Sequence, residues 1–125
     1  MSLIYHITAR KEWEQAQANG AYRAPSLEKE GFIHCSSRDQ ILKVANAFYR
    51  GLSDLVLLCI QPENLESVLK WEDPAHPNPD TPPSTDDREK FPHIYGQINL
   101  DALVNVTDFP ANADGTFTLP PDLPL

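Results

Sequence analysis

The stretch GFIHCSSRDQ, residues 31–40, decides the fold, because an apolar run changes into a helix start within it. FIHCS, residues 32–36, has the apolar and β-branched character of a short strand. Ser37 and Gln40 have the S-x-x-Q spacing of a capping box. The apolar residues that follow recur at helical spacing and stop before Gly51. The stretch therefore predicts a strand that leads directly into a helix.

A strand-to-helix joint can hold an anion or a ribose phosphate, because the first backbone amides of a helix have no partners within the helix. His34, Cys35 and Ser36 lie at this joint. Simple capping of the helix by the serines is the alternative interpretation. The sequence leaves both interpretations open.

The N-terminal half alternates between strand and helix patterns. LIYHIT, residues 3–8, is a predicted strand, and the helix that follows it is expected to end at Gly20. Residues 21–31 are expected to form a loop, since Pro25 lies within it. The continuous apolar run LVLLCI, residues 55–60, predicts a strand that is buried on both faces.

The C-terminal half contains more strand patterns than helix patterns. Strands are expected in LKWE, HIYGQI and VNVTDF. NLDAL predicts a helical turn, and a last strand is expected after the turn at Asp114 and Gly115. Because few helices separate the later strands, the sequence predicts an α+β fold and not a doubly wound sheet.

The chain length predicts a single domain over residues 1–125. With 125 residues, 41% of them hydrophobic, the chain can form one core and is too short for two domains. Residues 73–92 contain six prolines and no apolar periodicity, so a mobile loop is expected there. Such a loop is either a lid over a site or an insertion without a role.

Charge and composition restrict the partners and the compartment. The net charge of −8 opposes extended nucleic-acid binding, although a small anion pocket is compatible with it. Neither a leader peptide nor an apolar run long enough for a membrane span is present, so we expect a cytoplasmic protein. Cys35 and Cys59 lie in apolar runs and are predicted to be buried thiols, with a disulfide as the alternative.

Three histidines, His6, His34 and His93, fall on predicted strands. Histidines gathered from distant strands can line a cleft and transfer protons near neutral pH. The alternatives are that each is a buried, hydrogen-bonded histidine, or that the three hold zinc. Nothing in their spacing requires a metal, so none is expected. Glu72 is the one carboxylate beside an aromatic residue at a predicted strand end, so it is either a group whose pKa burial raises or an ordinary surface glutamate.

The order of motifs resembles a known family. IYHIT, EGFIHCS, VANAFY, VLLCI, WE and FPHIYG followed by DAL resemble the bacterial family called domain of unknown function 952 over about the first 110 residues. More distantly, the order of YHIT, IHCS, YRG, VLLCI and HIYG is similar to the tRNA 2'-phosphotransferases and to the ADP-ribosyltransferase fold. This similarity implies small split sheets with flanking helices.

The distant resemblance also implies roles for individual residues in binding NAD. His6 would hold a ribose hydroxyl, with Thr8 supporting the strand end. His34 and Ser36 match the second conserved strand of that fold, and Arg50 loosely matches an arginine of the phosphotransferases.

The distant resemblance also implies catalytic roles. His34 or His93 would handle a proton or a phosphate, and Tyr95 or Tyr49 would stack on the base. Where many ADP-ribosyltransferases carry a catalytic glutamate, this chain has His93 and its neighbours, so Glu72 is the candidate replacement.

Two functions therefore follow from the sequence. The first is a transferase-like enzyme, of ADP-ribosyl or phosphoryl type, that acts on NAD or a related ribose phosphate. The second is a non-catalytic module that binds a nucleotide or a peptide on the same fold. The missing glutamate and the scarcity of arginines favour the second, and the gathered histidines favour the first.

Overall fold

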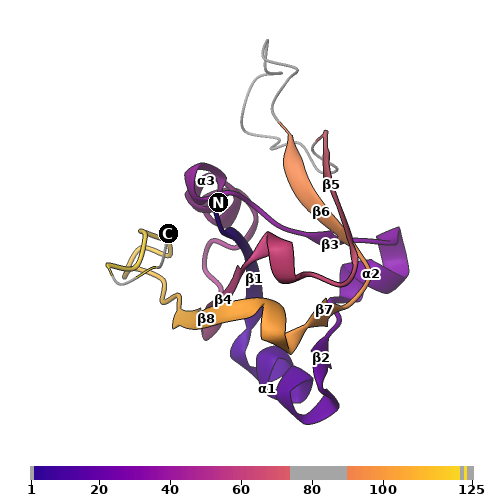
Figure 1. Cartoon of the computed structure of the whole chain (residues 1–125). Helices are drawn as coiled ribbons and strands as arrows, with labels where there is room; N and C mark the ends of the chain where they lie inside the picture. Colours follow the sequence, from indigo (N-terminus) through magenta and orange to yellow (C-terminus); the bar gives the residue numbers. More distant parts are fainter. Residues whose placement is uncertain (1, 74–89, 122, 124–125) are drawn as a thin grey trace.

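Figure 1 shows the computed structural model, which describes residues 2–73, 90–121 and 123. Within these residues the strands form three small antiparallel sheets, with helices beside them. The predicted α+β class and the split sheets are confirmed. The three sheets have the strand orders β1-β4-β8, β2-β7 and β3-β6-β5.

The β1-β4-β8 sheet lies at the centre of the core. It consists of β1 (Ile4–Ala9), β4 (Leu55–Ile60) and β8 (Leu103–Asp108). Every residue of β4 is buried, which confirms the prediction of a strand covered on both faces. Alternate β4 side chains belong to two apolar clusters: Leu58 packs in one with Ile33 and Ile94, and Leu57 packs in the other with Ile41 and Phe109.

Two helices are directly connected to strands. Helix α1 (Arg10–Asn19) follows β1 without a loop and ends at Gly20, whose φ of 86° suits glycine. Helix α3 (Arg38–Phe48) begins with the predicted capping box of Ser37 and Gln40. In Figure 1, α3 lies near the start of β1 and α1 continues from its other end.

The loop predicted for residues 21–31 is instead ordered into two elements. Strand β2 (Ala21–Tyr22) pairs with β7 (Ile98–Asn99), and α2 (Pro25–Glu30) follows it. The predicted loop was wrong, because Pro25 lies in the first turn of α2, where proline is favoured and does not break the helix.

The third sheet carries two of the strand histidines. It consists of β3 (Ile33–His34), β6 (Phe91–Tyr95) and β5 (Val68–Glu72). The FIHCS strand is shorter than predicted: its register with β6 ends at His34, and one further hydrogen bond runs from the Cys35 N–H to the Pro92 carbonyl over 3.0 Å. A single bridge between Tyr5 and Ser36 then connects this segment to β1.

The remaining segments differ from prediction in three places. HIYGQI is divided into β6 and β7 by Gly96, and β6 starts at Phe91, inside the expected loop. Within the described part of the chain, no strand follows Asp114; Phe117 stacks on Phe109 with ring centroids 4.8 Å apart. The short 3-10 helices are η1 (Pro62–Asn64) and η2 (Leu100–Ala102), and η2 is the predicted helical turn.

Most of the 73–92 loop lies outside the described residues. Cys35 and Cys59 are buried and unbonded to each other, as predicted. Among the described helices, none has the length and apolar character needed to cross a membrane.

Candidate binding cleft

A cleft of about 320 Å³ opens beside β1, between the start of α1, the start of α2 and the end of α3. Apolar side chains such as Leu52 and Leu55 form part of its wall. The polar and aromatic residues that line it are His6, Thr8, Glu12, Tyr22, Ser26, His34 and Tyr49. The volume lies in the range of small-molecule sites, and the mixture of apolar wall and few polar groups is typical of them.

A continuous chain of polar contacts crosses this cleft. The Nδ1–H of His6 donates to the backbone carbonyl of His34 over 2.5 Å, and Nε2 of His6 lies 2.8 Å from the phenol oxygen of Tyr22. That phenol oxygen lies 2.9 Å from Oγ1 of Thr8, which donates to Glu12 over 2.8 Å. Strand β1 supplies His6 and Thr8 on the same face, because side chains alternate along a strand.

Burial determines the charge of His6 and Tyr22, which form the inner end of this chain of polar contacts. Desolvation lowers the pKa of His6 to about 4, against a smaller opposing effect of its hydrogen bond to His34. Burial also raises the pKa of the Tyr22 phenol, which stays protonated. His6 is therefore neutral at pH 7, and both of its ring nitrogens face protein partners.

His34 connects the cleft to a second group of side chains. His34 is one of the residues that line the cleft, and its Nε2 lies 2.9 Å from a carboxylate oxygen of Glu30 at the end of α2. The ring of His34 is 4.8 Å from Phe32 and 5.6 Å from His93, measured between centroids. His34 thus belongs to both groups.

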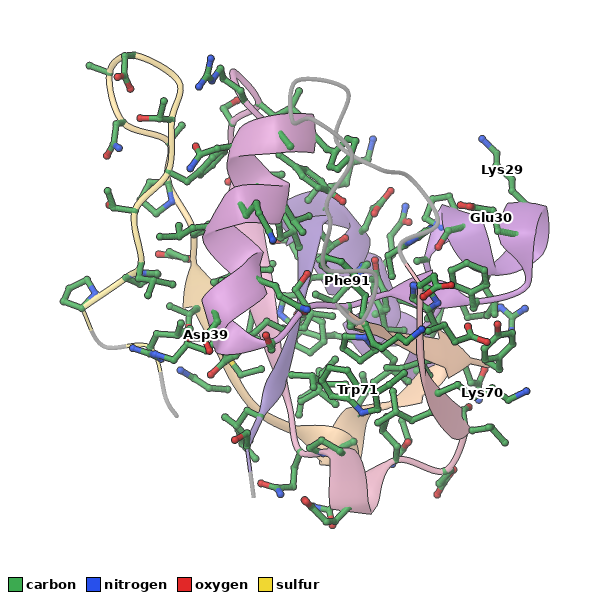
Figure 2. The ribbon with its side chains drawn as sticks, turned by 90° about the horizontal axis from the view of Figure 1, so that it is seen from above. Lys29, Glu30, Asp39, Lys70, Trp71 and Phe91 are labelled. Atoms are coloured by element: carbon green, nitrogen blue, oxygen red, sulfur yellow. The ribbon has the colours of Figure 1, made fainter. Side chains whose placement is uncertain are left out.

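The second group is an aromatic and carboxylate cluster on the third sheet. The Nδ1–H of His93 donates to Oε1 of Glu72 over 2.9 Å, and the Tyr95 hydroxyl donates to the same oxygen over 2.5 Å. Phe32 stacks on His93, with centroids 4.3 Å apart. Figure 2 labels Glu30 on α2 and Lys70 on β5, the two elements that flank this cluster.

The hydrogen bonds at Glu72 act against the predicted effect of burial. The bond from Tyr95 and then that from His93 lower the pKa of Glu72, and these effects outweigh desolvation. Of the two interpretations of Glu72, the one with a raised pKa was wrong, because the carboxylate is only partly buried and accepts two hydrogen bonds. Glu72 is therefore ionised at neutral pH.

Two predicted site residues, Ser36 and Arg50, lie outside both the cleft and the aromatic cluster. Ser36 is buried, and its backbone is paired with Tyr5 in the bridge between sheets. Arg50 is exposed and lies beside Gly115, a residue of the turn that follows β8. Among the described residues that line the cleft there is no lysine or arginine.

Sequence reasoning missed Glu12, Tyr22 and Glu30. Glu12 could have been found, because it lies four residues after Thr8 at the start of a helix. Glu30 precedes His34 by the same spacing across the Gly31 turn. Tyr22 gave no local signal, since only the pairing of β2 with β7 places it under β1.

The alternative of a zinc site finds no support in the geometry. No three histidine, cysteine, aspartate or glutamate side chains in the described part of the chain are placed to hold a metal ion. His6 is 2.5 Å from a carbonyl oxygen and 2.8 Å from a phenol oxygen, so its nitrogens are already engaged.

The model of the family "Protein of unknown function (DUF952)" matches residues 7–106, which include most of the cleft and all of the aromatic cluster. The chain belongs to this family. The match confirms the resemblance to domain of unknown function 952. No curated protein is significantly similar to the chain in sequence.

Two solved structures have a similar fold. The crystal structure of protein CC0527 from Caulobacter crescentus is 32% identical, with a TM-score of 0.77 and 94% of each chain covered. The solution NMR structure of CC0527 gives 32% identity and a TM-score of 0.73, with 93% of this chain and 91% of that chain covered. Both are structural genomics targets, and the similarity to ADP-ribosyltransferases stays a prediction.

Proposed function

We propose that this DUF952 protein binds the ribose and base portion of a nucleotide, such as NAD or a related ribose phosphate, and acts on it as a transferase-like enzyme. The observation that carries the proposal is the polar chain from His6 to Glu12 within a cleft of about 320 Å³. A cleft of this size accommodates a sugar with one attached ring, but not a whole dinucleotide enclosed on all sides.

The groups in the cleft suit a sugar better than a phosphate. The carboxylate of Glu12 accepts hydrogen bonds from hydroxyl groups, and Tyr49 is an aromatic residue of the lining on which a flat ring could stack. No cationic side chain among the lining residues would neutralise a phosphate, and Glu12 would repel one. We therefore assign the cleft to the ribose and ring, with the phosphates toward solvent.

NAD bound in this way would supply the ribosyl group for a transfer reaction. His34 is the member of the predicted catalytic set that lines the cleft, and Glu30 orients its ring through Nε2. His93 lies behind it, with Nδ1–H directed to Glu72, so that Nε2 of His93 is the proton-accepting nitrogen. In the proposal His34 contacts the ligand, while His93 and Glu72 position and polarise the ring of His34.

Affinity measurements on two tyrosine variants test the assignment of the cleft. Tyr49 lines the cleft, whereas Tyr95 lies in the aromatic cluster, and the resemblance had made either one the stacking residue. Stacking of a base on an aromatic ring contributes about 1–3 kcal/mol, so Tyr49→Leu should weaken NAD binding about 5- to 150-fold. Tyr95→Leu is the matched control and should leave affinity within about twofold.

Calorimetry with NAD, ADP-ribose and nicotinamide gives these affinities directly. A larger loss of affinity in Tyr95→Leu than in Tyr49→Leu would mean that the ligand binds at the aromatic cluster. Failure of the wild-type protein to bind any of the three compounds would reject the proposal.

One observation favours a non-catalytic binding module as the second candidate. Both ring nitrogens of His6 face protein groups, so the most deeply placed histidine has no free nitrogen for a ligand. Release of nicotinamide during long incubation with NAD distinguishes the two functions. Release that is lost in His34→Ala supports the enzyme, and saturable binding without product supports the binding module.

A further inference from the structure

The four polar contacts of the cleft contain one hydrogen too few when His6 is neutral and Glu12 is ionised. The carbonyl of His34 requires the Nδ1–H of His6, since a carbonyl only accepts. The carboxylate of Glu12 likewise requires the hydroxyl hydrogen of Thr8. One hydrogen, that of the Tyr22 hydroxyl, is left for the two contacts on either side of it.

One added proton completes the chain in either of two ways. A proton on Nε2 of His6 lets that nitrogen donate to Tyr22, and Tyr22 then donates to Thr8. A proton on Glu12 lets the carboxyl group donate to Thr8, so that Thr8 donates to Tyr22 and Tyr22 to His6. The two arrangements have the same heavy-atom positions and differ only in where hydrogens reside.

We propose that Glu12, Thr8, Tyr22 and His6 form a single proton-accepting unit, in which a proton taken up by the carboxylate of Glu12 is handed on to Nε2 of His6. In the transfer, Glu12 loses the proton from Oε2 to Oγ1 of Thr8. Thr8 passes its own hydrogen to the phenol oxygen of Tyr22, and Tyr22 passes its hydrogen to His6. Each hydroxyl ends with the one hydrogen it began with, while the carboxyl becomes a carboxylate and the imidazole an imidazolium.

The positions of these four side chains suit the uptake of a proton. Glu12 is half-buried and lines the cleft, whereas the other three side chains are buried. A proton from water or from a ligand hydroxyl therefore has access to the unit at Glu12. The unit lets the half-buried carboxylate of Glu12 and the buried His6, whose Nε2 lies 2.8 Å from Tyr22, act as one base, although the two side chains do not touch.

Among the titratable groups around the unit, His34 acts on His6 through its charge, which adds to burial in lowering the pKa of His6. Tyr49 from the end of α3 and Cys35 beyond β3 are near Tyr22, and burial raises the pKa of both, so they remain protonated. His34 from β3 faces His6 through its backbone carbonyl and lies at the rim of the same cleft. None of the described residues lining the cleft is a lysine or an arginine.

Titration of the ligand-free protein followed by NMR tests the proposal independently of any nucleotide. The carboxyl carbon of Glu12 and the ring nitrogens of His6 are observed together through the acidic pH range. In the wild type both signals should report shared macroscopic midpoints, since coupled groups titrate as one unit. Thr8→Val keeps the side-chain shape but removes the linking hydroxyl, so the midpoints of Glu12 and His6 should separate by about one pH unit or more.

Two further variants make the result unambiguous. Tyr22→Phe interrupts the chain of polar contacts at another point and should separate the midpoints in the same way. It serves as the test if Thr8→Val does not fold. Ser26→Ala removes a hydroxyl of the cleft lining that makes none of the four contacts, and it should leave the shared midpoints unchanged. Independent midpoints in the wild type, or shared midpoints that survive both chain variants, would overturn the proposal. Neither result depends on whether NAD binds, so the proposed function is judged separately.

Discussion

His34 and His93 are register partners on β3 and β6, and their ring centroids lie 5.6 Å apart. Directly opposite residues of antiparallel strands project to the same face of a sheet. Lys70 of β5 is the next partner in that row, whereas Trp71 extends from the other face of the strand, as Figure 2 shows. Strand pairing therefore brings together histidines that are far apart in the chain.

The Tyr95 hydroxyl lowers the pKa of Glu72 through a hydrogen bond. Its hydrogen bond is the largest of the effects that lower the pKa of this carboxylate. Tyr95→Phe should therefore raise the pKa of Glu72 toward its ordinary value, as measured by NMR titration of the carboxyl carbon. Lys70→Met removes a smaller charge effect and should raise it less. A pKa that stays unchanged in Tyr95→Phe would show that the hydrogen bond does not form.

His6 makes stability depend on pH. Because burial lowers its pKa from 6.5 to about 4, the unfolded state binds more protons than the folded state between these values. The contribution of neutral His6 is complete above about pH 6.5, and it is lost as the pH falls toward 4. In this window His6 should add up to about 1.4 kcal/mol per pH unit to the slope of the unfolding free energy.

Comparison with His6→Asn isolates this effect, since asparagine can still donate to the carbonyl of His34 but does not titrate. Urea unfolding at several pH values should give a shallower slope for the variant than for the wild type. Equal slopes would mean that His6 is protonated in the folded state over this range.

Gly96 is required at the break between β6 and β7. Its φ is 155°, and a Cβ there would lie 2.4 Å from Oγ and 2.9 Å from Cβ of Ser67. Gly96→Ala should therefore reduce the unfolding free energy by about 1–3 kcal/mol. The double variant Gly96→Ala with Ser67→Gly removes the clash but keeps the backbone strain, so it should recover part of the loss relative to Ser67→Gly alone.

Leu58 tests the two-sided burial of β4. Its side chain is fully buried in the cluster that also contains Ile33 and Ile94. Leu58→Ala should cost about 2–5 kcal/mol of unfolding free energy, because it leaves a cavity in the core. Val104→Ala on β8 is the control: its side chain is half exposed, so the expected change is within about 0.5 kcal/mol. Similar losses for both variants would contradict this account of the core.

The sequence by itself determined the features that depend on neighbouring residues. The continuous apolar run of β4, the capping box of Ser37 and Gln40 and the Gly20 helix end were all predicted, because each depends on residues a few positions apart. Pro25 shows the limit of such rules, since the same residue can end one helix or start another.

Only the tertiary structure decided which side chains share a site. Tyr22 reaches His6 because β2 pairs with β7, and Glu72 reaches His93 because β5 pairs with β6. Such pairings depend on contacts between strands distant in the chain, so local periodicity and spacing carry no record of them. For the same reason the sequence identified three histidines, and the fold divided them between the cleft and the aromatic cluster, with His34 in both.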